Sequence, residues 1–241
     1  MAPLVLVHGF MGGGEQWERQ RTDLGDRISI ITPCLPGFGS NAGLAAPDTI
    51  HDYARFVLDE LSAQGIETFQ LLGHSMGGMI VQEMVAIAPE RVARLVLYGT
   101  GAASNVKGRF ETYEESKRRA SEEGAQATAR RIAATWFADG DRAPGYADCA
   151  AIAQQASLQA IHAGIDAFGN WSRADNLANI KCPTLIIWGE HDRSYAWPQI
   201  EQLWRTIPAA SLAVVPGCAH AVHLEKPELF NLLLRDFVLQ S

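Results

Sequence analysis

Residues 68–88 read TFQLLGHSMGGMIVQEMVAIA, and this stretch decides the fold. An apolar run of strand length, Thr68–Leu72, is followed by G-x-S-x-G at Gly73–Gly77 and by the helical periodicity of Ser75–Ala88. A serine on such a strand-to-helix turn presents its hydroxyl at the turn, and small residues two positions away let the strand and the helix approach each other. We therefore predict that Ser75 is a nucleophile; the alternative is a serine that only caps a helix.

Similar apolar runs recur on both sides of this stretch, and they predict the strands Leu4–Val7, Ile28–Ile31, Leu95–Tyr98, Thr184–Trp188 and Leu212–Val215. They are apolar throughout rather than alternating, as strands buried on both faces are. Helical periodicity marks Asp48–Leu61 and Pro227–Leu239. Alternating strands and helices predict an α/β fold, a mostly parallel central sheet with helices on both faces.

The alternation is interrupted between residues 103 and 178, where no good strand is found. Helical periodicity appears instead at Phe110–Arg119, Ala125–Phe137 and Ala147–Phe168. We interpret residues 1–241 as a single domain, with residues 103–178 as a helical cap inserted at the carboxyl end of the sheet, where such folds bind ligands.

Composition narrows the class of protein. The 241 residues are 47% hydrophobic and 20% charged with a net charge of -7, which is typical of a globular protein and argues against a nucleic-acid binder. No apolar run approaches the roughly 20 residues that cross a bilayer, so we expect no membrane association. The first residues lack the features of a signal peptide, and we expect a cytoplasmic protein.

The four cysteines are scattered, at positions 34, 149, 182 and 218. None forms a CxxC pair, so we expect neither a zinc site nor a disulfide framework. We predict no metal and no cofactor.

A serine nucleophile needs a base, and the base needs an orienting group. Asp192 and His220 each lie on a loop that follows a predicted strand, and we predict them as acid and base because such loops meet at one edge of a parallel sheet. Glu190 is an alternative acid. His223 is an alternative base, although its place at the entry to the last helix favours packing there. For the two remaining nearby histidines, His74 and His191, we favour solvation or local hydrogen bonding.

An oxyanion hole requires two backbone N–H groups aimed at one point. We predict that Met76, directly after the nucleophile, supplies one and that Phe10 supplies the other. Phe10 lies in the glycine-rich loop His8–Gly14, for which a phosphate-binding loop is the alternative. That loop lacks both G-x-x-x-x-G-K-[ST] and G-x-G-x-x-G, which argues against nucleotide binding.

Aromatic residues in and near the cap are candidates for the walls of a substrate pocket: Trp136, Phe137, Phe168, Trp171 and Trp197. The alternative for each is that it belongs to the core of the cap. Arg109, Arg118 and Arg119 are candidates for attracting an acidic substrate, although charges along a helix usually form a solvated face.

The chain resembles the α/β-hydrolase superfamily in segments that follow the family's order, namely His8–Phe10, Leu35–Gly39, Gly73–Gly78, Cys182–Leu185, Gly189 with Asp192, and Gly217–Pro227. The resemblance covers nearly the whole chain. It implies a mostly parallel central sheet, a helical cap at 103–178 and a triad of Ser75, Asp192 and His220. The most similar groups are small esterases, enol-lactonases, carbon–carbon bond hydrolases and menaquinone-pathway synthases.

Three positions depart from these patterns. Ala219 replaces the glycine that usually precedes the catalytic histidine of the family. Met79 stands where the synthases usually carry arginine, and His74 stands where the carbon–carbon hydrolases usually carry asparagine.

Three functions remain open at this point. The first is a serine hydrolase that cleaves a carboxylic ester, a lactone or a related acyl bond of a small molecule through an acyl-enzyme. The second uses the same triad as a base for carbon–carbon cleavage or elimination. The third is a non-catalytic small-molecule sensor. The sequence predicts no oligomeric state.

Overall fold

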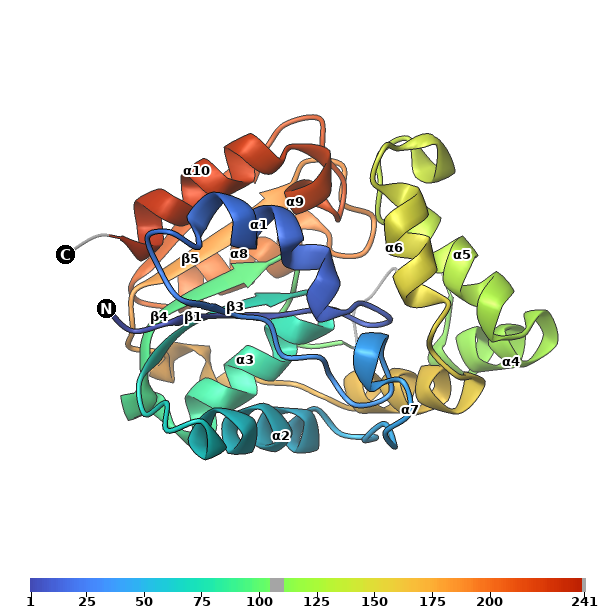
Figure 1. Cartoon of the computed structure of the whole chain (residues 1–241), viewed down its shortest axis with the longest axis horizontal. Helices are drawn as coiled ribbons and strands as arrows, with labels where there is room; N and C mark the ends of the chain where they lie inside the picture. Colours follow the sequence, from blue (N-terminus) through green and yellow to red (C-terminus); the bar gives the residue numbers. More distant parts are fainter. Residues whose placement is uncertain (105–110, 240–241) are drawn as a thin grey trace.

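The computed structural model describes residues 1–104 and 111–239. Its centre is a six-stranded parallel sheet with the strand order β2-β1-β3-β4-β5-β6 (Figure 1). The strands are β1 (Leu4–Val7), β2 (Ile30–Ile31), β3 (Phe69–His74), β4 (Val92–Tyr98), β5 (Thr184–Gly189) and β6 (Ala210–Val215). The α/β fold expected from the sequence is therefore present, and all six strands are parallel.

Helices cover both faces of the sheet. One face carries α1 (Glu18–Leu24) and α10 (Pro227–Val238), and the other carries α2 (Ile50–Ala63), α3 (Met76–Ile87) and α8 (Trp197–Thr206) (Figure 1). Short α9 (Val222–Glu225) precedes α10, and the 3-10 helices are Gly14–Trp17, Gly39–Asn41, Pro89–Arg91, Gly140–Arg142 and Ala174–Asn179. None of the helices in the described part of the chain has the length and apolarity that crossing a bilayer requires.

The core forms on both faces of β1 because successive side chains of a strand point in opposite directions. Val5 and Val7 pack with the helices α2, α3 and α8, whereas Leu4 and Leu6 pack with α1 and α10. All four side chains are fully buried. This explains why the inner strands read as uninterrupted apolar runs rather than as alternating ones.

β6 differs from the expectation of a strand buried on both faces. It is one of the two edge strands of the sheet, and Val214 is 45% exposed. An apolar run alone does not distinguish an edge strand from a central one. The order of the strands in the sheet decides which strand lacks a neighbour, and that order is not encoded in the run itself.

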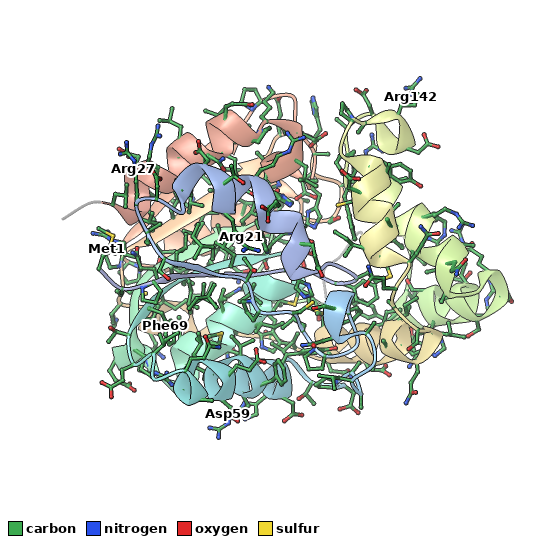
Figure 2. The ribbon with its side chains drawn as sticks, in the orientation of Figure 1. Met1, Arg21, Arg27, Asp59, Phe69 and Arg142 are labelled. Atoms are coloured by element: carbon green, nitrogen blue, oxygen red, sulfur yellow. The ribbon has the colours of Figure 1, made fainter. Side chains whose placement is uncertain are left out.

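Four helices, α4 (Tyr113–Glu123), α5 (Ala125–Thr135), α6 (Tyr146–Ala153) and α7 (Leu158–Gly169), lie between β4 and β5 in sequence. They stand beside the carboxyl ends of the strands, to the right in Figure 1. Asp59 projects from α2 at the other side of the molecule, whereas Arg142 marks the outer end of the insertion (Figure 2). The insertion thus forms a wall over the carboxyl ends of the strands.

The single helix expected over Ala147–Phe168 is in fact two helices. The chain turns after α6, and the side chain of Ser157 accepts a hydrogen bond from the backbone N–H of Ala160 to begin α7. A serine at this position satisfies one of the N–H groups that a new helix leaves open, so it favours a break over a continuous helix. The helix expected from Phe110 begins at Tyr113, and Phe110 itself lies outside the described residues.

The two ends of the insertion are joined at its base. Ala103 and Ser172 form an antiparallel bridge, and the N–H of Arg173 donates to the carbonyl of Ala102 over 2.7 Å. Glu83 of α3 accepts two hydrogen bonds from the Arg173 guanidinium, at 2.6 and 2.7 Å, and one from Trp171 at 3.1 Å. The helix that begins beside Ser75 is therefore tied to the segment in which the insertion returns to the sheet.

The carboxylate of Glu83 is ionised by this arrangement. Burial raises its pKa, but hydrogen bonds from Arg173, His51 and Trp171 outweigh burial and lower the pKa to about 2. A carboxylate with a depressed pKa stabilises the folded state at pH values above its unfolded pKa of roughly 4.3, and this contribution is lost as the pH falls toward 2.

We predict that Glu83→Gln lowers the free energy of unfolding at pH 7 by roughly 3 kcal/mol, because it leaves the Arg173 charge without its partner. The variant also loses less stability than the wild type between pH 5 and pH 3. Denaturant unfolding at several pH values measures both effects. Glu18→Gln is the matched control, since Glu18 forms only an exposed pair with Arg21 at 3.5 Å and the change should cost under about 1 kcal/mol. Equal losses in the two variants would contradict the anchoring role of Glu83.

Candidate active site

Ser75 occupies a sharp turn between β3 and α3. Its backbone has φ 56° and ψ -120°, and it is one of two non-glycine residues with positive φ among the described residues. Such a conformation is strained for an L-residue and persists only where the surroundings impose it. The N–H of Ser75 donates to the carbonyl of Tyr98 over 3.0 Å, and its own carbonyl accepts from the Thr100 hydroxyl over 2.8 Å. The turn is therefore held from β4 and from the segment that follows it.

Two glycines allow this turn because nothing larger fits. A Cβ at Gly73 would collide with the carbonyl of Gly77, and a Cβ at Gly77 would collide with the carbonyls of Val7 and His8. The amino end of α3 thus rests directly on β3 and on the end of β1. This close approach is the physical reason why glycine occupies both ends of G-x-S-x-G.

Asp192 and His220 form a buried pair next to this turn. The Nδ1 of His220 lies 2.8 Å from the Oδ2 of Asp192, and both side chains are almost completely buried. The other carboxylate oxygen, Oδ1, accepts from the backbone N–H groups of Ser194 and Tyr195, at 2.7 and 3.2 Å. The carboxylate is fixed at both oxygens, so it holds the imidazole in one orientation and fixes its tautomer.

Glu190, the alternative acid, lies elsewhere. Its side chain is 52% exposed and accepts a hydrogen bond from the N–H of Gly217 over 3.0 Å. His191 is also exposed, 3.9 Å from the same carboxylate. The two residues face solvent because Glu190 and His191 precede the turn that brings Asp192 inward.

His74 and His223 are buried next to His220. The hydrogen bond expected for His74 is present, since its Nε2 lies 3.1 Å from the carbonyl oxygen of His220. His223 packs against the rings of Trp17 and Phe230 at the entry to the last helix, as expected. Burial lowers the pKa of His74 well below its ordinary value, and the nearby His220 and His223 lower it further. Burial and His220 together lower the pKa of His223 to about 3. Both imidazoles are therefore neutral near pH 7, and neither is suited to take up a proton.

The loop that carries Phe10 is pinned at its start. The Nε2 of His8 accepts from the N–H of Leu35 over 2.9 Å, so its Nδ1 carries the proton that is donated to the carbonyl of Gly9 over 2.8 Å. The ring of Phe10 packs against Phe38, with 5.7 Å between the ring centroids. Met76 is the first residue of α3, where a helix offers no acceptor for the N–H. The structure thus places Phe10 and Met76 on the two elements that flank Ser75.

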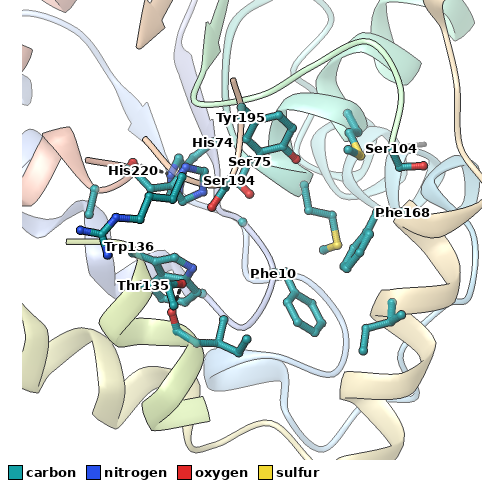
Figure 3. Close-up of a pocket in the computed structure, with 18 of the residues that line it drawn as sticks. Phe10, His74, Ser75, Ser104, Thr135, Trp136, Phe168, Ser194, Tyr195 and His220 are labelled. Atoms are coloured by element: carbon teal, nitrogen blue, oxygen red, sulfur yellow. Dashed lines mark hydrogen bonds between the residues drawn. The ribbon is translucent and has the colours of Figure 1, made fainter. Parts of the chain in front are cut away.

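A cavity of about 260 Å³ lies between the sheet edge and the insertion. Ser75 and His220 both line it, together with Phe10 and Met76. In Figure 3, Ser75, His74, His220 and Tyr195 gather at one end of the pocket, while Phe10 and Phe168 border the other side. The strand ends supply the polar end of this cavity and the insertion supplies much of the apolar wall.

The structure brings two of the five predicted aromatic residues, Trp136 and Phe168, to the wall of this cavity. The other three lie elsewhere and correct the expectation. Phe137 is fully buried against Tyr146 inside the insertion, Trp171 bonds to Glu83 at its base, and Trp197 is partly exposed against Trp188. None of these three side chains is among the residues that line the cavity.

The chain matches the Alpha/beta hydrolase family over residues 4–231, which is nearly its whole length. The chain belongs to this family. It is 29% identical over 258 residues to the pimeloyl-[acyl-carrier protein] methyl ester esterase of Aromatoleum aromaticum, covering 98% of this chain and 97% of that protein. It is 28% identical over 241 residues to RutD of Azorhizobium caulinodans, a protein provisionally named a carbamate hydrolase, covering 98% and 90%.

Solved structures agree with this membership. An esterase from Thermogutta terrifontis superposes with a TM-score of 0.89 at 25% identity, over 99% of this chain and 89% of that one. An enol-lactonase from Burkholderia xenovorans reaches a TM-score of 0.90 at 22% identity, over 100% and 92%, and it shows a likeness of fold. The sequence and the structure therefore place this chain among α/β hydrolases.

Several wall residues of this hydrolase were not foreseen from the sequence, and they include Gln16, Met79, Tyr113, Ile165, Arg193 and Tyr195. They lie on five different segments that are distant in sequence, so periodicity within any one segment gives no signal for them. The only available signal was that Arg193 and Tyr195 directly follow Asp192.

Two of the three arginines proposed to attract an acidic substrate, Arg118 and Arg119, have other partners. Arg118 pairs with Glu115 and Glu122, and Arg119 pairs with Glu123, as charges on a solvated helix face usually do. Arg109 lies outside the described residues. Within residues 1–104 and 111–239, no group of three or more His, Cys, Asp or Glu residues is placed to hold a metal ion.

Glu225 joins the His220 loop of the hydrolase to the helical insertion between β4 and β5. One carboxylate oxygen accepts from the N–H of Ala219, next to His220, and the other accepts from the N–H of Ala138 in the insertion, both over 2.7 Å. A carboxylate suits this position because both of its oxygens accept and neither donates.

Glu225→Gln should loosen both segments, because its amide NH₂ would face one of these two N–H groups. We expect the amide protons of Ala219 and Ala138 to exchange with solvent at least tenfold faster in the variant, as measured by hydrogen exchange. Glu228→Gln at the start of α10 is the control and should leave both rates unchanged. Unchanged rates at both amides in Glu225→Gln would contradict the clamp.

Proposed function

We propose that this protein is a serine hydrolase that cleaves a carboxylic ester, a lactone or a related acyl bond of a small molecule. One observation carries the proposal: Ser75 and His220 line the same cavity while a buried Asp192 holds the imidazole from behind. The strained elbow at Ser75 and the two flanking N–H groups fit the same chemistry. Membership of the hydrolase family agrees with it.

The proposed reaction has two acyl-transfer steps. His220 takes the proton of the Ser75 hydroxyl as the oxygen attacks the substrate carbonyl, and Asp192 stabilises the imidazolium that forms. The N–H groups of Phe10 and Met76 stabilise the oxyanion. His220 then gives its proton to the leaving alcohol, and a water molecule deprotonated by the same imidazole releases the acid from Ser75.

The size and lining of the cavity suggest a small substrate. A volume of about 260 Å³ lies just below the usual range for ligand sites, roughly 300–1,000 Å³, and the walls mix apolar groups such as Trp136 and Phe168 with polar ones near Ser75. The names of the similar proteins point to esters and carbamates. We propose short acyl esters, lactones or carbamates as the substrate class, with no cofactor.

Ser75→Ala tests the nucleophile. With p-nitrophenyl acetate we expect the wild type to release a burst of nitrophenol equal to the enzyme concentration, followed by slower turnover. Ser75→Ala should show no burst and a kcat/KM at least 10³-fold lower, because the covalent intermediate cannot form. Ser121→Ala is the matched control, since this cap hydroxyl bonds to the carbonyl of Lys117. Turnover of carbon–carbon substrates only, or full activity in Ser75→Ala, would reject the proposal.

The acid is tested by a pair of neighbouring carboxylates. Asp192→Asn should lower kcat by about 10⁴-fold, because an amide at this place favours the wrong tautomer of His220. Glu190→Gln removes a negative charge two residues away and should change kcat by less than threefold, as expected of an exposed side chain. Steady-state kinetics with the same ester measure both values, and a larger loss in Glu190→Gln would reverse the assignment.

A further inference from the structure

His220 lies on the loop between β6 and α9, which has no regular secondary structure to hold it. Its carbonyl oxygen is nevertheless bound twice. The hydroxyl of Tyr98 donates to it over 2.8 Å, and the Nε2 of His74 lies 3.1 Å from it. Tyr98 ends β4 and His74 ends β3, so two rigid strands reach the same atom of the loop.

The other end of the same peptide unit is also bound. The N–H of Ala221 donates to the carbonyl of Trp136 in the cap over 2.8 Å. The peptide plane between His220 and Ala221 is therefore fixed at its C=O and at its N–H. Asp192 holds the ring at Nδ1. The imidazole therefore cannot turn its Nε2 away from the cavity without breaking one of these hydrogen bonds.

The directions of these hydrogen bonds follow from the number of protons available. A carbonyl cannot donate, so the Nε2 of His74 carries the proton and its Nδ1, which is buried and has no partner among the described residues, is bare. The one hydroxyl proton of Tyr98 is used on the His220 carbonyl. The Nδ1 of His223, 3.0 Å from that hydroxyl, must then donate to it.

The last member of the chain follows in the same way. With its proton on Nδ1, His223 has a bare Nε2, which accepts from the side-chain amide of Gln16 over 3.5 Å. A chain of hydrogen bonds thus runs from Gln16 through His223 and Tyr98 to the carbonyl of His220. Burial lowers the pKa of both His74 and His223, so both imidazoles are neutral near pH 7 and neither competes with His220 for a proton.

We propose that Tyr98 and His74 are positioning residues of the hydrolase, which hold His220 in the orientation that both acyl-transfer steps require. The proposal rests on the function proposed above. It assigns to Tyr98 a role that its place in an apolar strand did not suggest. It also explains why a histidine rather than an apolar residue lies between Gly73 and Ser75.

Tyr98→Phe removes the hydroxyl and keeps the ring. We expect kcat for p-nitrophenyl acetate to fall about tenfold with KM within twofold of the wild type, because His220 serves acylation and deacylation alike. The concentration of competent enzyme is counted by titration with a fluorophosphonate that labels Ser75. An unchanged kcat per labelled site would overturn the role of Tyr98.

Phe230→Leu is the matched control for packing. The Phe230 ring lies 4.9 Å from the ring of Tyr98 and 6.0 Å from that of His223. Its truncation loosens the same cluster without removing a hydrogen bond. It should lower the melting temperature and leave kcat per labelled site unchanged. An equal loss of kcat in both variants would mean that Tyr98→Phe acts through packing, and would overturn the positioning role of the hydroxyl.

A measurement on the unaltered protein tests the network directly, including the case in which Tyr98→Phe does not fold. ¹⁵N NMR of histidine-labelled protein should show His74 as the Nε2–H tautomer and His223 as the Nδ1–H tautomer, both neutral from pH 5 to pH 9. The opposite tautomer at either residue would overturn the network. A wild type that hydrolyses no ester and is not labelled by the phosphonate would instead reject the proposed function, whatever the tautomers are.

Discussion

The structure depends on one close approach, that of the amino end of α3 to β3 and β1 at the elbow. Gly73 and Gly77 leave no room for a Cβ there, and Ser75 takes a positive φ between them. A larger residue at either glycine would separate the helix from the strands. The serine would then leave the edge of the sheet, and the cavity would lose the group around which its other polar residues are arranged.

Parallel strands explain how residues far apart in sequence reach this serine. Every strand ends at the same edge, so the loops after β3, β5 and β6 deliver Ser75, Asp192 and His220 to one place. Loops are free to take shapes that strands cannot, but they need bonds to keep those shapes. Here Glu225, Tyr98 and His74 bind the backbone around His220, and backbone N–H groups bind the carboxylate of Asp192.

The insertion between β4 and β5 is attached to the same core. Glu83 lies two turns along α3 from the elbow and binds Arg173 and Trp171 where the insertion returns to the sheet. Trp136 accepts from the His220 loop on the opposite side. The wall of the cavity is thus attached both to the helix that begins at the elbow and to the loop that carries His220, which holds its apolar residues in place relative to the polar end.

Local patterns predicted the sheet, the helices and the candidate site residues, because each depends on short-range geometry. The G-x-S-x-G turn between a strand and a helix can be recognised from a stretch of about twenty residues. Placing Asp192 and His220 near it requires only the rule that parallel strands end at the same edge of the sheet. The comparison with known proteins confirmed the fold and the family. The break before Ser157 and the exposure of β6 were missed, since a capping serine and an edge strand leave little trace in periodicity.

Contacts between distant segments were decided only by the tertiary structure. The sequence by itself determined that Ser75 lies at an elbow and that a helical insertion follows β4. It did not determine that Asp192 rather than Glu190 binds His220, that only Trp136 and Phe168 of the five predicted aromatics reach the cavity, or that Tyr98 binds the His220 loop. The physical reason is that such hydrogen bonds and burial depend on the direction of each side chain, which is set by the packing of segments that lie 28 to 122 residues apart in these hydrogen bonds.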